Sequence, residues 1–456
     1  MKCINPFTKQ EIGVVDPCDT ASIPRLVSKA KLAGAWSARQ TIGVRVSWIK
    51  SFRELFSEKR SSLAKVLSIE TGKPISQAIS EVAATLSRID YFIETVPKVL
   101  DKKIVRKDGN TVEELSYEPL GVIANISAWN YPYFIGTNVF IPALLAGNAV
   151  LYKPSELAAL VGAEIASMFY ESGLPENLFI TLQGAGDVGS VLASAKVDGL
   201  FFTGSNKTGL EIARAAAEKL IPCVLELGGK DPCYITANAG DIKQTAQSVA
   251  DGVFYNAGQS CCSVERLYVH KDVYEEFVAC FLDEVRNYRI GDPLDSDTYI
   301  GPMTRSEQLE LLEFQVRDAV SKGAQLLLGG DMVAFPSGFF PPTVLADVNH
   351  NMVVMREESF GPIIGIHKVS SDEEAVHLMN DTSFGLTAAV YTDSFDQGRD
   401  ILAEVPAGSV YVNCCDRVSP FLPWSGRQGS GLGSTLGHRG IYSLVHPKSW
   451  HIRTVE

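Results

Sequence analysis

The sequence predicts an α/β fold with more than one domain. From Leu120 onward, short apolar runs alternate with segments in which apolar residues recur at helical spacing. This alternation is typical of a parallel sheet that helices cover on both faces. The chain has 456 residues, more than one hydrophobic core usually supports. We therefore expect at least two domains.

Candidate strands fall into two groups. The first group is 121–126, 149–152, 177–182, 199–202 and 223–226. A second α/β unit is expected to begin near Gly228, with strands at 266–269, 325–328, 363–367, 388–391 and 408–412. The first 95 residues instead show helical spacing, at 23–35, at 44–69 and again up to about residue 93.

Two further segments are expected to be extended. Residues 102–118 alternate charged, polar and β-branched residues around Asp108-Gly109-Asn110, which predicts a hairpin. The tail, 443–455, is a candidate edge strand.

The composition argues against several classes of protein. A formal net charge of -12 disfavours nucleic acid as the main partner. The longest apolar segment, 139–151, contains Pro142 and Gly147 and is too short to span a bilayer. No signal peptide is evident, and nine cysteines, an odd number, favour free thiols, so we expect a cytoplasmic protein. The absence of C-x-x-C and H-E-x-x-H patterns predicts no metal site.

Cys261 is the candidate nucleophile. It ends the run Phe254-Tyr-Asn-Ala-Gly-Gln-Ser-Cys261, whose small residues would let a substrate approach the sulfur closely. A thiolate attacks a carbonyl carbon readily once its pKa is lowered. The alternative is a buried structural cysteine. Without the neighbouring motifs, a single cysteine would favour this alternative, because free cysteines are usually buried.

Glu226 is the candidate general base. It ends an apolar strand and precedes Leu227-Gly228-Gly229-Lys230. A carboxylate at a strand end can lie in a poorly solvated cleft, which raises its pKa toward neutrality and suits a base. The alternative is a surface glutamate in a turn.

Together the two motifs resemble the aldehyde dehydrogenase superfamily. The pattern E-L-G-G-K followed by F-x-x-x-G-Q-x-C is highly specific, and the resemblance covers nearly the whole chain in the family's order. It implies that Cys261 forms a thiohemiacetal with an aldehyde, that hydride transfer to NAD(P) leaves a thioester, and that Glu226 activates the water that hydrolyses this thioester.

The resemblance also implies an oxyanion site. Ala128-Trp129-Asn130-Tyr131-Pro132 resembles the family's P-W-N-x-P, with Ala128 in place of the proline. The side-chain amide of Asn130 and the backbone N–H of Cys261 are then the donors for the oxyanion. An asparagine that only forms a turn is the alternative.

A dinucleotide site follows from the same resemblance. Lys153 and Glu156 would hold the adenosine ribose, and the carboxylate favours NAD, although NADP stays possible. Two glycine motifs compete for the pyrophosphate: 184–189 matches G-x-G-x-x-G, whereas the resemblance assigns the phosphate to Gly204 and Ser205. The implied cofactor residues are Trp129, Lys153, Ser155, Glu156, Gly204, Ser205, Leu227, Glu358 and Phe360.

The sequence departs from the family at two positions near the base. Many members carry Lys where this chain has Val139, and Glu where it has Thr435. This puts the rate and pH dependence of deacylation in doubt, but not the reaction class.

Substrate and rival functions stay open. An uncharged aldehyde is the first expectation. Succinate semialdehyde or another carboxylated aldehyde is the alternative, because Arg417 can replace an arginine that such relatives carry near the position of Asn138. A non-catalytic binding protein on the same fold and a cofactor-free thiol hydrolase are the rivals from other classes.

The resemblance implies three parts. These are a cofactor-binding domain at 1–100 and 120–227, a catalytic domain at 228–442, and an oligomerisation element at 101–119 and 443–456. Exposed edge strands need partners, so a homodimer or homotetramer is expected.

Overall fold

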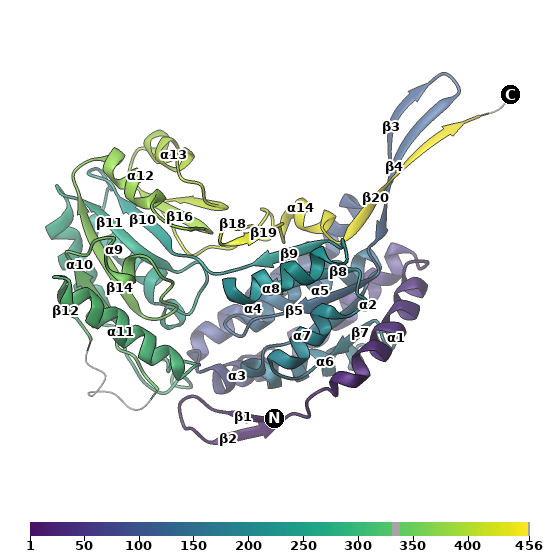
Figure 1. Cartoon of the computed structure of the whole chain (residues 1–456), viewed down its shortest axis with the longest axis horizontal. Helices are drawn as coiled ribbons and strands as arrows, with labels where there is room; N and C mark the ends of the chain where they lie inside the picture. The colour runs from purple at the N-terminus through teal and green to yellow at the C-terminus, as the bar shows by residue number, and fades with distance from the viewer. Residues whose placement is uncertain (331–337, 455–456) are drawn as a thin grey trace.

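Two sheets and a β arm organise the chain, of which the computed structural model describes residues 1–330 and 338–454. In Figure 1 the first sheet and its helices form one lobe, the second sheet and its helices form the other, and the arm projects from the first lobe. The two lobes have separate hydrophobic cores. The predicted α/β class is confirmed.

The first sheet has six strands in the order β19-β9-β8-β5-β6-β7. They are β5 (Val122–Ile126), β6 (Ala149–Lys153), β7 (Phe179–Thr181), β8 (Gly199–Thr203), β9 (Cys223–Glu226) and β19 (Gly431–Leu432). Strands β5 to β9 pair in parallel, and β19 runs antiparallel to β9. Every residue of β5 and β6 is buried, as expected for strands covered on both faces.

Eight helices precede or connect these strands. They are α1 (Ile23–Ser37), α2 (Ile42–Glu58), α3 (Arg60–Thr71), α4 (Ile75–Val99), α5 (Pro132–Ala146), α6 (Ala159–Glu171), α7 (Gly186–Ser194) and α8 (Asn206–Ala217). Helix α4 forms because its buried residues, among them Ala78, Val82, Ile89 and Phe92, recur every three or four positions.

The strand order places a ligand crevice in this lobe. The chain passes from β5 to β6 on one side and later returns to β8 on the other side of β5. Ligands of open parallel sheets bind at the carboxyl ends of the strands, where the order reverses in this way. The segments that follow β5, β6, β8 and β9 therefore meet at one edge.

The second sheet has seven strands in the order β12-β13-β14-β11-β10-β16-β17. They are β10 (Asp231–Ile235), β11 (Val264–His270), β12 (Gln325–Leu328), β13 (Thr343–Ala346), β14 (Ile363–Val369), β16 (Thr387–Tyr391) and β17 (Ser409–Val412). The helices of this lobe are α9 (Ile242–Phe254), α10 (Tyr274–Arg286), α11 (Glu307–Ser321), α12 (Asp372–Asn380) and α13 (Phe395–Ala403). Only β12 is antiparallel to its neighbour.

The strands predicted for both sheets are present, but sequence patterns missed β10, β13 and the two-residue strand β19. Strand β10 begins with Asp231-Pro232, a charge and a proline, which are atypical of a central strand. Its register shifts between these two residues, so the proline is accommodated at an irregularity. Strand β13 has only four residues and follows Pro341-Pro342.

The helix predicted over 44–69 was wrong in one respect, because it is two helices. Helix α2 ends before Lys59 and α3 begins after it, since Lys59 leaves the helical conformation with ψ of 3°. The ammonium of Lys59 binds the carboxylate of Glu171 on α6 at 2.7 Å. A short N-terminal hairpin, β1 (Lys2–Ile4) with β2 (Glu11–Val14), was also missed.

The arm contains β3 (Lys103–Asp108), β4 (Thr111–Pro119) and β20 (Val445–Arg453) in the order β20-β4-β3. The predicted hairpin and tail strand are thus paired with each other, over the full length of β20. Before the arm, β19 and α14 (Gly437–Tyr442) bring the chain back to the first lobe, where Trp424 and Ile441 join its core.

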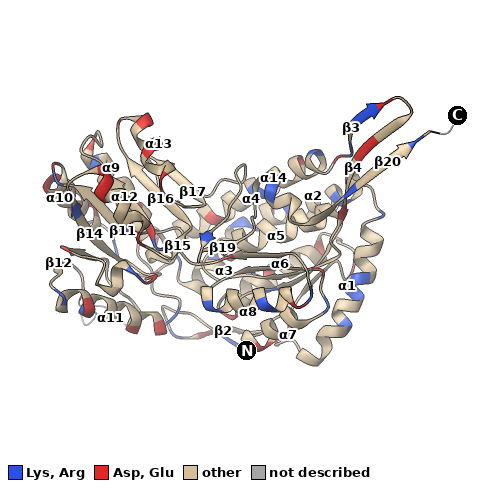
Figure 2. Ribbon diagram, turned by 45° about the horizontal axis from the view of Figure 1, so that its top comes forward, with Lys and Arg blue, Asp and Glu red and all other residues tan. Residues whose placement is uncertain are grey.

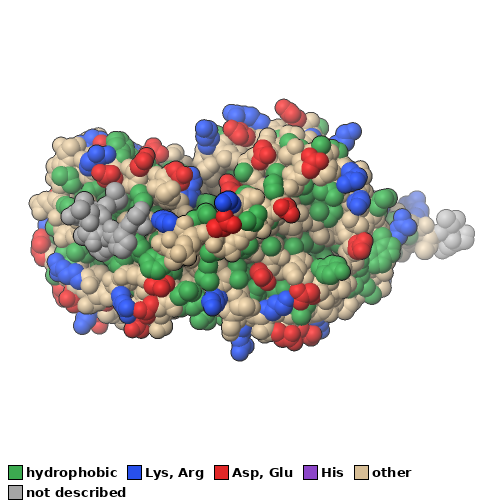
Figure 3. All heavy atoms as spheres, turned by 90° about the horizontal axis from the view of Figure 1, so that it is seen from below, with side chains coloured by type: hydrophobic (Ala, Val, Ile, Leu, Met, Phe, Trp, Pro, Cys, Tyr) green, Lys and Arg blue, Asp and Glu red, His purple; other side chains and the backbone are tan. Residues whose placement is uncertain are grey.

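Charges of both signs are mixed over the surface. Figure 2 shows acidic and basic residues on the helices of both lobes and on the arm. On the face in Figure 3, charged side chains are interspersed with apolar ones. Among the described residues, no helix is long and apolar enough to cross a membrane. The same residues contain no group of three or more His, Cys, Asp or Glu side chains that could hold a metal ion.

Candidate active site

The three predicted catalytic residues come from three segments, two at the carboxyl ends of strands β5 and β9 and one directly before strand β11. Asn130 lies between β5 and α5, Glu226 ends β9, and Cys261 follows the short helical turn Tyr255–Gly258. A Cβ atom built on Gly229 would lie 2.8 Å from the carbonyl oxygen of Cys261, so the turn after Glu226 touches the nucleophile segment. The side-chain nitrogen of Asn130 donates to the carbonyl of Gln259 at 3.2 Å. The structure therefore brings the three segments together.

The turn before Cys261 has an unusual backbone. Asn256, Ala257 and Gly258 all have positive φ angles, of 54°, 54° and 67°. Left-handed backbone is costly for residues other than glycine and persists only where surrounding contacts hold it. Here the N–H of Asn256 donates to the side chain of Gln77 at 2.9 Å, and its side-chain nitrogen donates to Gln259 at 3.2 Å.

Gly258 has a further constraint. A Cβ atom there would lie 2.3 Å from the carbonyl oxygen of Gly361, so only glycine fits. The turn leaves Cys261 partly exposed, whereas the next residue, Cys262, is buried. Of the two thiols, Cys261 is the one that a substrate can reach.

A second carboxylate lies beside the nucleophile segment. Asp416 accepts hydrogen bonds from the thiol of Cys262 at 3.0 Å and from the hydroxyl of Ser260 at 3.2 Å. Burial raises the pKa of Asp416 to about 6, against the lowering effect of these two hydrogen bonds. It is therefore mostly ionised above neutral pH.

A buried ion pair holds the segment that carries Asn130. The ammonium of Lys73 donates to the backbone carbonyl of Asn130 at 2.8 Å and binds the carboxylate of Glu81 on α4. The same carboxylate accepts from the N–H of Tyr133, in the first turn of α5, at 3.1 Å. Burial lowers the pKa of Lys73, which Glu81 offsets.

Sequence reasoning missed Lys73 and Glu81. Both residues lie in the N-terminal region for which the sequence predicted only helices. A lysine between a glycine and a proline, outside any amphipathic pattern, was the available signal.

Glu226 is buried at the end of β9, with 8% of its surface exposed. The hydroxyl of Thr435 donates to one of its carboxylate oxygens, and Thr203 lies 3.5 Å from the other. Burial raises the pKa of Glu226 to about 7, while Thr435, Arg88 and Thr203 lower it. Val139 lies in the core of the first lobe and contributes no charge.

Arg88 is a second residue that sequence reasoning missed. It lies on α4 and is 4% exposed. Its guanidinium donates to the side chain of Asn138 and to the carbonyl of Val418, both at 3.0 Å. Burial lowers its pKa to about 10. Among the described residues it has no carboxylate within 4.0 Å.

A groove of about 340 Å³ lies at the switch point of the first sheet. Of the predicted cofactor residues, it is lined by Trp129, Lys153, Ser155, Glu156 and Gly204. Lys153 and Glu156 form an ion pair at 3.6 Å on its wall. Ser205 caps α8 by accepting from the N–H of Thr208 at 3.4 Å.

Both glycine motifs reach this groove, because Gly186 and Gly189 also line it. Its residues fit a dinucleotide on two grounds. The N-terminus of α8 offers free N–H groups and a positive dipole end to a phosphate, and the Lys153–Glu156 pair offers a donor and an acceptor to ribose hydroxyls.

The remaining predicted cofactor residues lie on the side toward the nucleophile. Glu358 accepts from the N–H of Gly229 at 3.2 Å, and the ring of Phe360 meets that of Trp129 edge-on, with centroids 5.6 Å apart. Leu227 packs against Gly209 of α8, where a Cβ atom would lie 2.5 Å from it.

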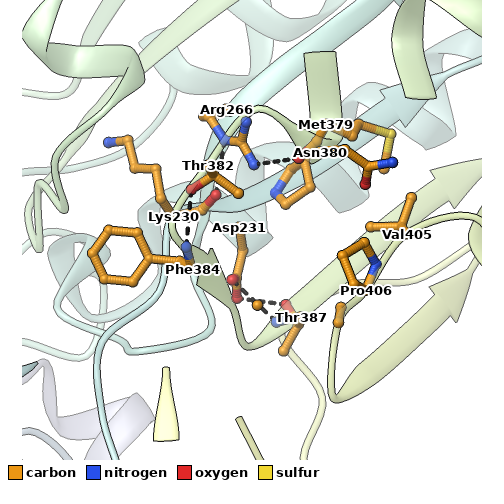
Figure 4. Close-up of a pocket in the computed structure, with 13 residues that line it drawn as sticks. Lys230, Asp231, Arg266, Met379, Asn380, Thr382, Phe384, Thr387, Val405 and Pro406 are labelled. Carbon is orange, nitrogen blue, oxygen red and sulfur yellow. Dashed lines mark hydrogen bonds between the residues drawn. The ribbon is translucent and has the colours of Figure 1, made fainter. Parts of the chain in front are cut away.

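Buried polar residues also support the far side of the Gly228-Gly229 turn. Figure 4 shows a cavity lined by Lys230, Asp231 and Arg266, among others, with a volume of about 10 Å³, room for about one water molecule. Asp231 accepts from the hydroxyl of Thr387 at 2.6 Å, and Arg266 donates to the carbonyl of Lys230 at 2.8 Å. These bonds fix the chain directly after the turn that carries Glu226.

Comparison with known proteins gives one consistent result. The model of the aldehyde dehydrogenase family matches residues 1–450. Succinate-semialdehyde dehydrogenase [NADP(+)] of Deinococcus radiodurans is 33% identical over 98% of this chain and 93% of the relative. Peroxisomal aminoaldehyde dehydrogenase 2 of Pisum sativum is 35% identical over 98% of this chain and 91% of the relative.

Solved structures agree. The crystal structure of indole-3-acetaldehyde dehydrogenase in complex with NAD+ superposes with a TM-score of 0.96 at 29% identity, over 100% of this chain and 93% of that one. Sequence and fold therefore both match aldehyde dehydrogenases over nearly their full lengths.

Proposed function

This chain belongs to the aldehyde dehydrogenase family, whose members are NAD(P)-dependent enzymes that oxidise aldehydes, and from that premise we propose roles for three residues. Cys261 is the nucleophile, Glu226 is the general base, and Asn130 is an oxyanion donor. One observation carries this proposal: a partly exposed thiol on a rigid turn lies against the segment that presents a buried carboxylate with a pKa near neutrality.

The first half of the reaction is thiolate addition. The sulfur of Cys261 attacks the aldehyde carbon, and the carbonyl electron pair moves to the oxygen. The side-chain amide of Asn130 and the N–H of Cys261 donate to this oxyanion, and the Lys73 bond to the Asn130 carbonyl keeps the amide in place. NAD(P), held by the groove residues, would accept the hydride that leaves the former aldehyde carbon, and the carbonyl of a thioester on the Cys261 sulfur would then re-form.

The second half is hydrolysis. Glu226 takes a proton from water, the oxygen attacks the thioester carbon, and the carbon–sulfur bond breaks to release the carboxylic acid and the thiolate. Only the ionised carboxylate can accept this proton. Because the pKa of Glu226 is about 7, we expect deacylation to slow as the pH falls through neutrality.

For the cofactor we propose a preference for NAD over NADP. The Glu156 carboxylate beside Lys153 accepts a hydrogen bond from a free ribose hydroxyl and repels a phosphate there.

For the substrate we propose an aldehyde without a carboxylate. Asp416, bonded to Ser260 and Cys262, places a negative charge next to the nucleophile segment. The guanidinium of Arg88 is already bonded to Asn138 and Val418. A carboxylated aldehyde is therefore repelled by Asp416. The exposed Arg417 is the cation of this segment that could offset the repulsion.

For the assembly we propose three domains with the boundaries expected from the sequence and a homo-oligomer in the cytoplasm. The arm exposes Ile104, Val105 and Trp450, and exposed apolar side chains on edge strands favour contact with a second copy. All nine cysteines are free, which favours the cytoplasm. Sedimentation velocity would contradict the oligomer by giving a monomer of 49.5 kDa at micromolar concentration.

The Glu226→Gln variant tests the catalytic proposal. Thiolate addition and hydride transfer do not need the base, so one equivalent of NADH per active site should form in a burst. Steady-state turnover should fall by about 100-fold or more, because the water is no longer activated. Stopped-flow absorbance measures both phases. Loss of the burst would place Glu226 before hydride transfer, and no NADH from the wild type with any aldehyde would support the non-catalytic alternative.

The Glu156→Ser variant tests the cofactor preference. Removal of the carboxylate should raise the ratio of kcat/KM for NADP over NAD by about tenfold, because one like-charge contact is lost. Exposed Glu171, which faces Lys59 far from the groove, provides the control Glu171→Ser. An unchanged ratio in Glu156→Ser would remove Glu156 from the ribose site.

The Asp416→Asn variant tests the substrate proposal. Wild type should favour an unsubstituted four-carbon aldehyde over succinate semialdehyde in kcat/KM at pH 8. The substitution should narrow this ratio by about tenfold, because the repelling charge is removed. Arg417→Met is the matching test of the alternative. If succinate semialdehyde were the better substrate and Arg417→Met abolished its advantage, the carboxylated-aldehyde alternative would be correct.

A further inference from the structure

The carboxylate of Glu226 has no cation in contact with it. Its hydrogen-bond partners are hydroxyls, from Thr435 in the segment after β19 and from Thr203 at the end of β8. In the described part of the chain, no lysine, arginine or histidine nitrogen lies within 4.0 Å of it. A buried carboxylate in this situation would ordinarily be neutral, and a neutral carboxyl group is no base.

Arg88 is the matching cation without an anion in contact. It is buried on α4, and its two hydrogen bonds go to neutral oxygens, of Asn138 and Val418. These bonds tether the guanidinium between α5 and the segment after β17. From there its positive charge lowers the pKa of Glu226, although no ion pair or hydrogen bond joins the two side chains.

The other ionisable groups around Glu226 do not provide this stabilisation. Glu358, which lies against Gly228, and the thiols of Cys261 and Cys262 are groups that never carry a positive charge, so none of them can offset the charge of the Glu226 carboxylate. Lys73 is already paired with Glu81. Arg88 is therefore the one cation of the described site that acts on Glu226.

We propose that Thr435 and Arg88 are positioning residues for Glu226: the Thr435 hydroxyl holds the carboxylate by a hydrogen bond, and the tethered charge of Arg88 keeps it ionised. This proposal rests on the role of Glu226 as the base. It gives a function to Thr435, one of the two positions where the sequence departs from many relatives. At the other position, Val139 lies in the hydrophobic core and takes no part in holding Glu226.

The Thr435→Val variant tests the hydrogen bond. It keeps the shape of the side chain and removes the donor, so Glu226 should hold its proton more strongly. The rate of acyl-enzyme decay is followed by quenched flow and mass spectrometry at a series of pH values. The midpoint of this pH profile should rise by on the order of one unit, the equivalent of one hydrogen bond to a charged group. The NADH burst should be retained. Thr435→Ser, which keeps the hydroxyl, should restore the wild-type pH profile.

Ser434→Ala is the matched control. Ser434 is the neighbouring buried hydroxyl, but it donates to the carbonyls of Trp424 and Thr435, not to Glu226. Its removal should leave the midpoint of the pH profile where it is in the wild type. A merely structural effect in this segment would shift the midpoint of the pH profile in both Thr435→Val and Ser434→Ala, or in neither of them.

Arg88→Met should shift the midpoint upward as well, and Arg88→Lys should shift it less. Thermal unfolding shows whether these two variants fold. If they do not, the Thr435 series decides, and an unmoved midpoint in Thr435→Val overturns the proposal. The base assignment fails separately: if the Glu226→Gln variant kept the same pH-dependent decay, Glu226 would not be the titrating group, whatever Thr435 does.

Discussion

The four residues Leu227–Lys230 impose the constraint on which the site depends. They join β9 of the first sheet directly to β10 of the second, so one short connection leads from the first lobe into the other. Gly228 and Gly229 allow two close approaches there. A Cβ atom on Gly228 would lie 2.4 Å from the carboxylate of Glu358, and one on Gly229 would lie 2.8 Å from the Cys261 carbonyl. The proposed base Glu226 and the segment of the proposed nucleophile Cys261 are thereby held close together through the backbone of Gly229, and Glu358 is held against Gly228.

Buried charges hold the surrounding segments in register. Lys73 and Glu81 fasten the Asn130 segment to α4, and Lys230 binds Glu265 at 2.7 Å. The carboxylate of Glu265 also accepts a hydrogen bond from the backbone N–H of Ser359 at 2.8 Å, which fixes the segment that contains Glu358. Such pairs contribute little net stability, but breaking one leaves an uncompensated charge, so they specify a single arrangement of the loops.

Much of the fold and of the site could be predicted from the sequence, and the exceptions have physical reasons. Apolar runs identified the strands because buried parallel strands have few polar residues. Strand β10 was missed because it begins with Asp231-Pro232. Arg88 was missed because a charged residue in a predicted helix is usually exposed, and Lys73 was missed because it lies between two predicted helices, outside the pattern of either. Lys73 binds the backbone carbonyl of Asn130, 57 positions away, and Arg88 binds that of Val418, 330 positions away. Local sequence patterns do not contain such distant relations.

We propose that Cys261, and not its buried neighbour Cys262, carries the acyl group. The most direct measurement is peptide mapping by mass spectrometry of the Glu226→Gln variant, quenched after reaction with NAD and an aldehyde. The account predicts an acyl adduct on Cys261 in stoichiometric amount, formed together with the NADH burst and absent when Cys261 is replaced by alanine. An adduct on Cys262, or a burst of NADH with no acyl-cysteine, would contradict it.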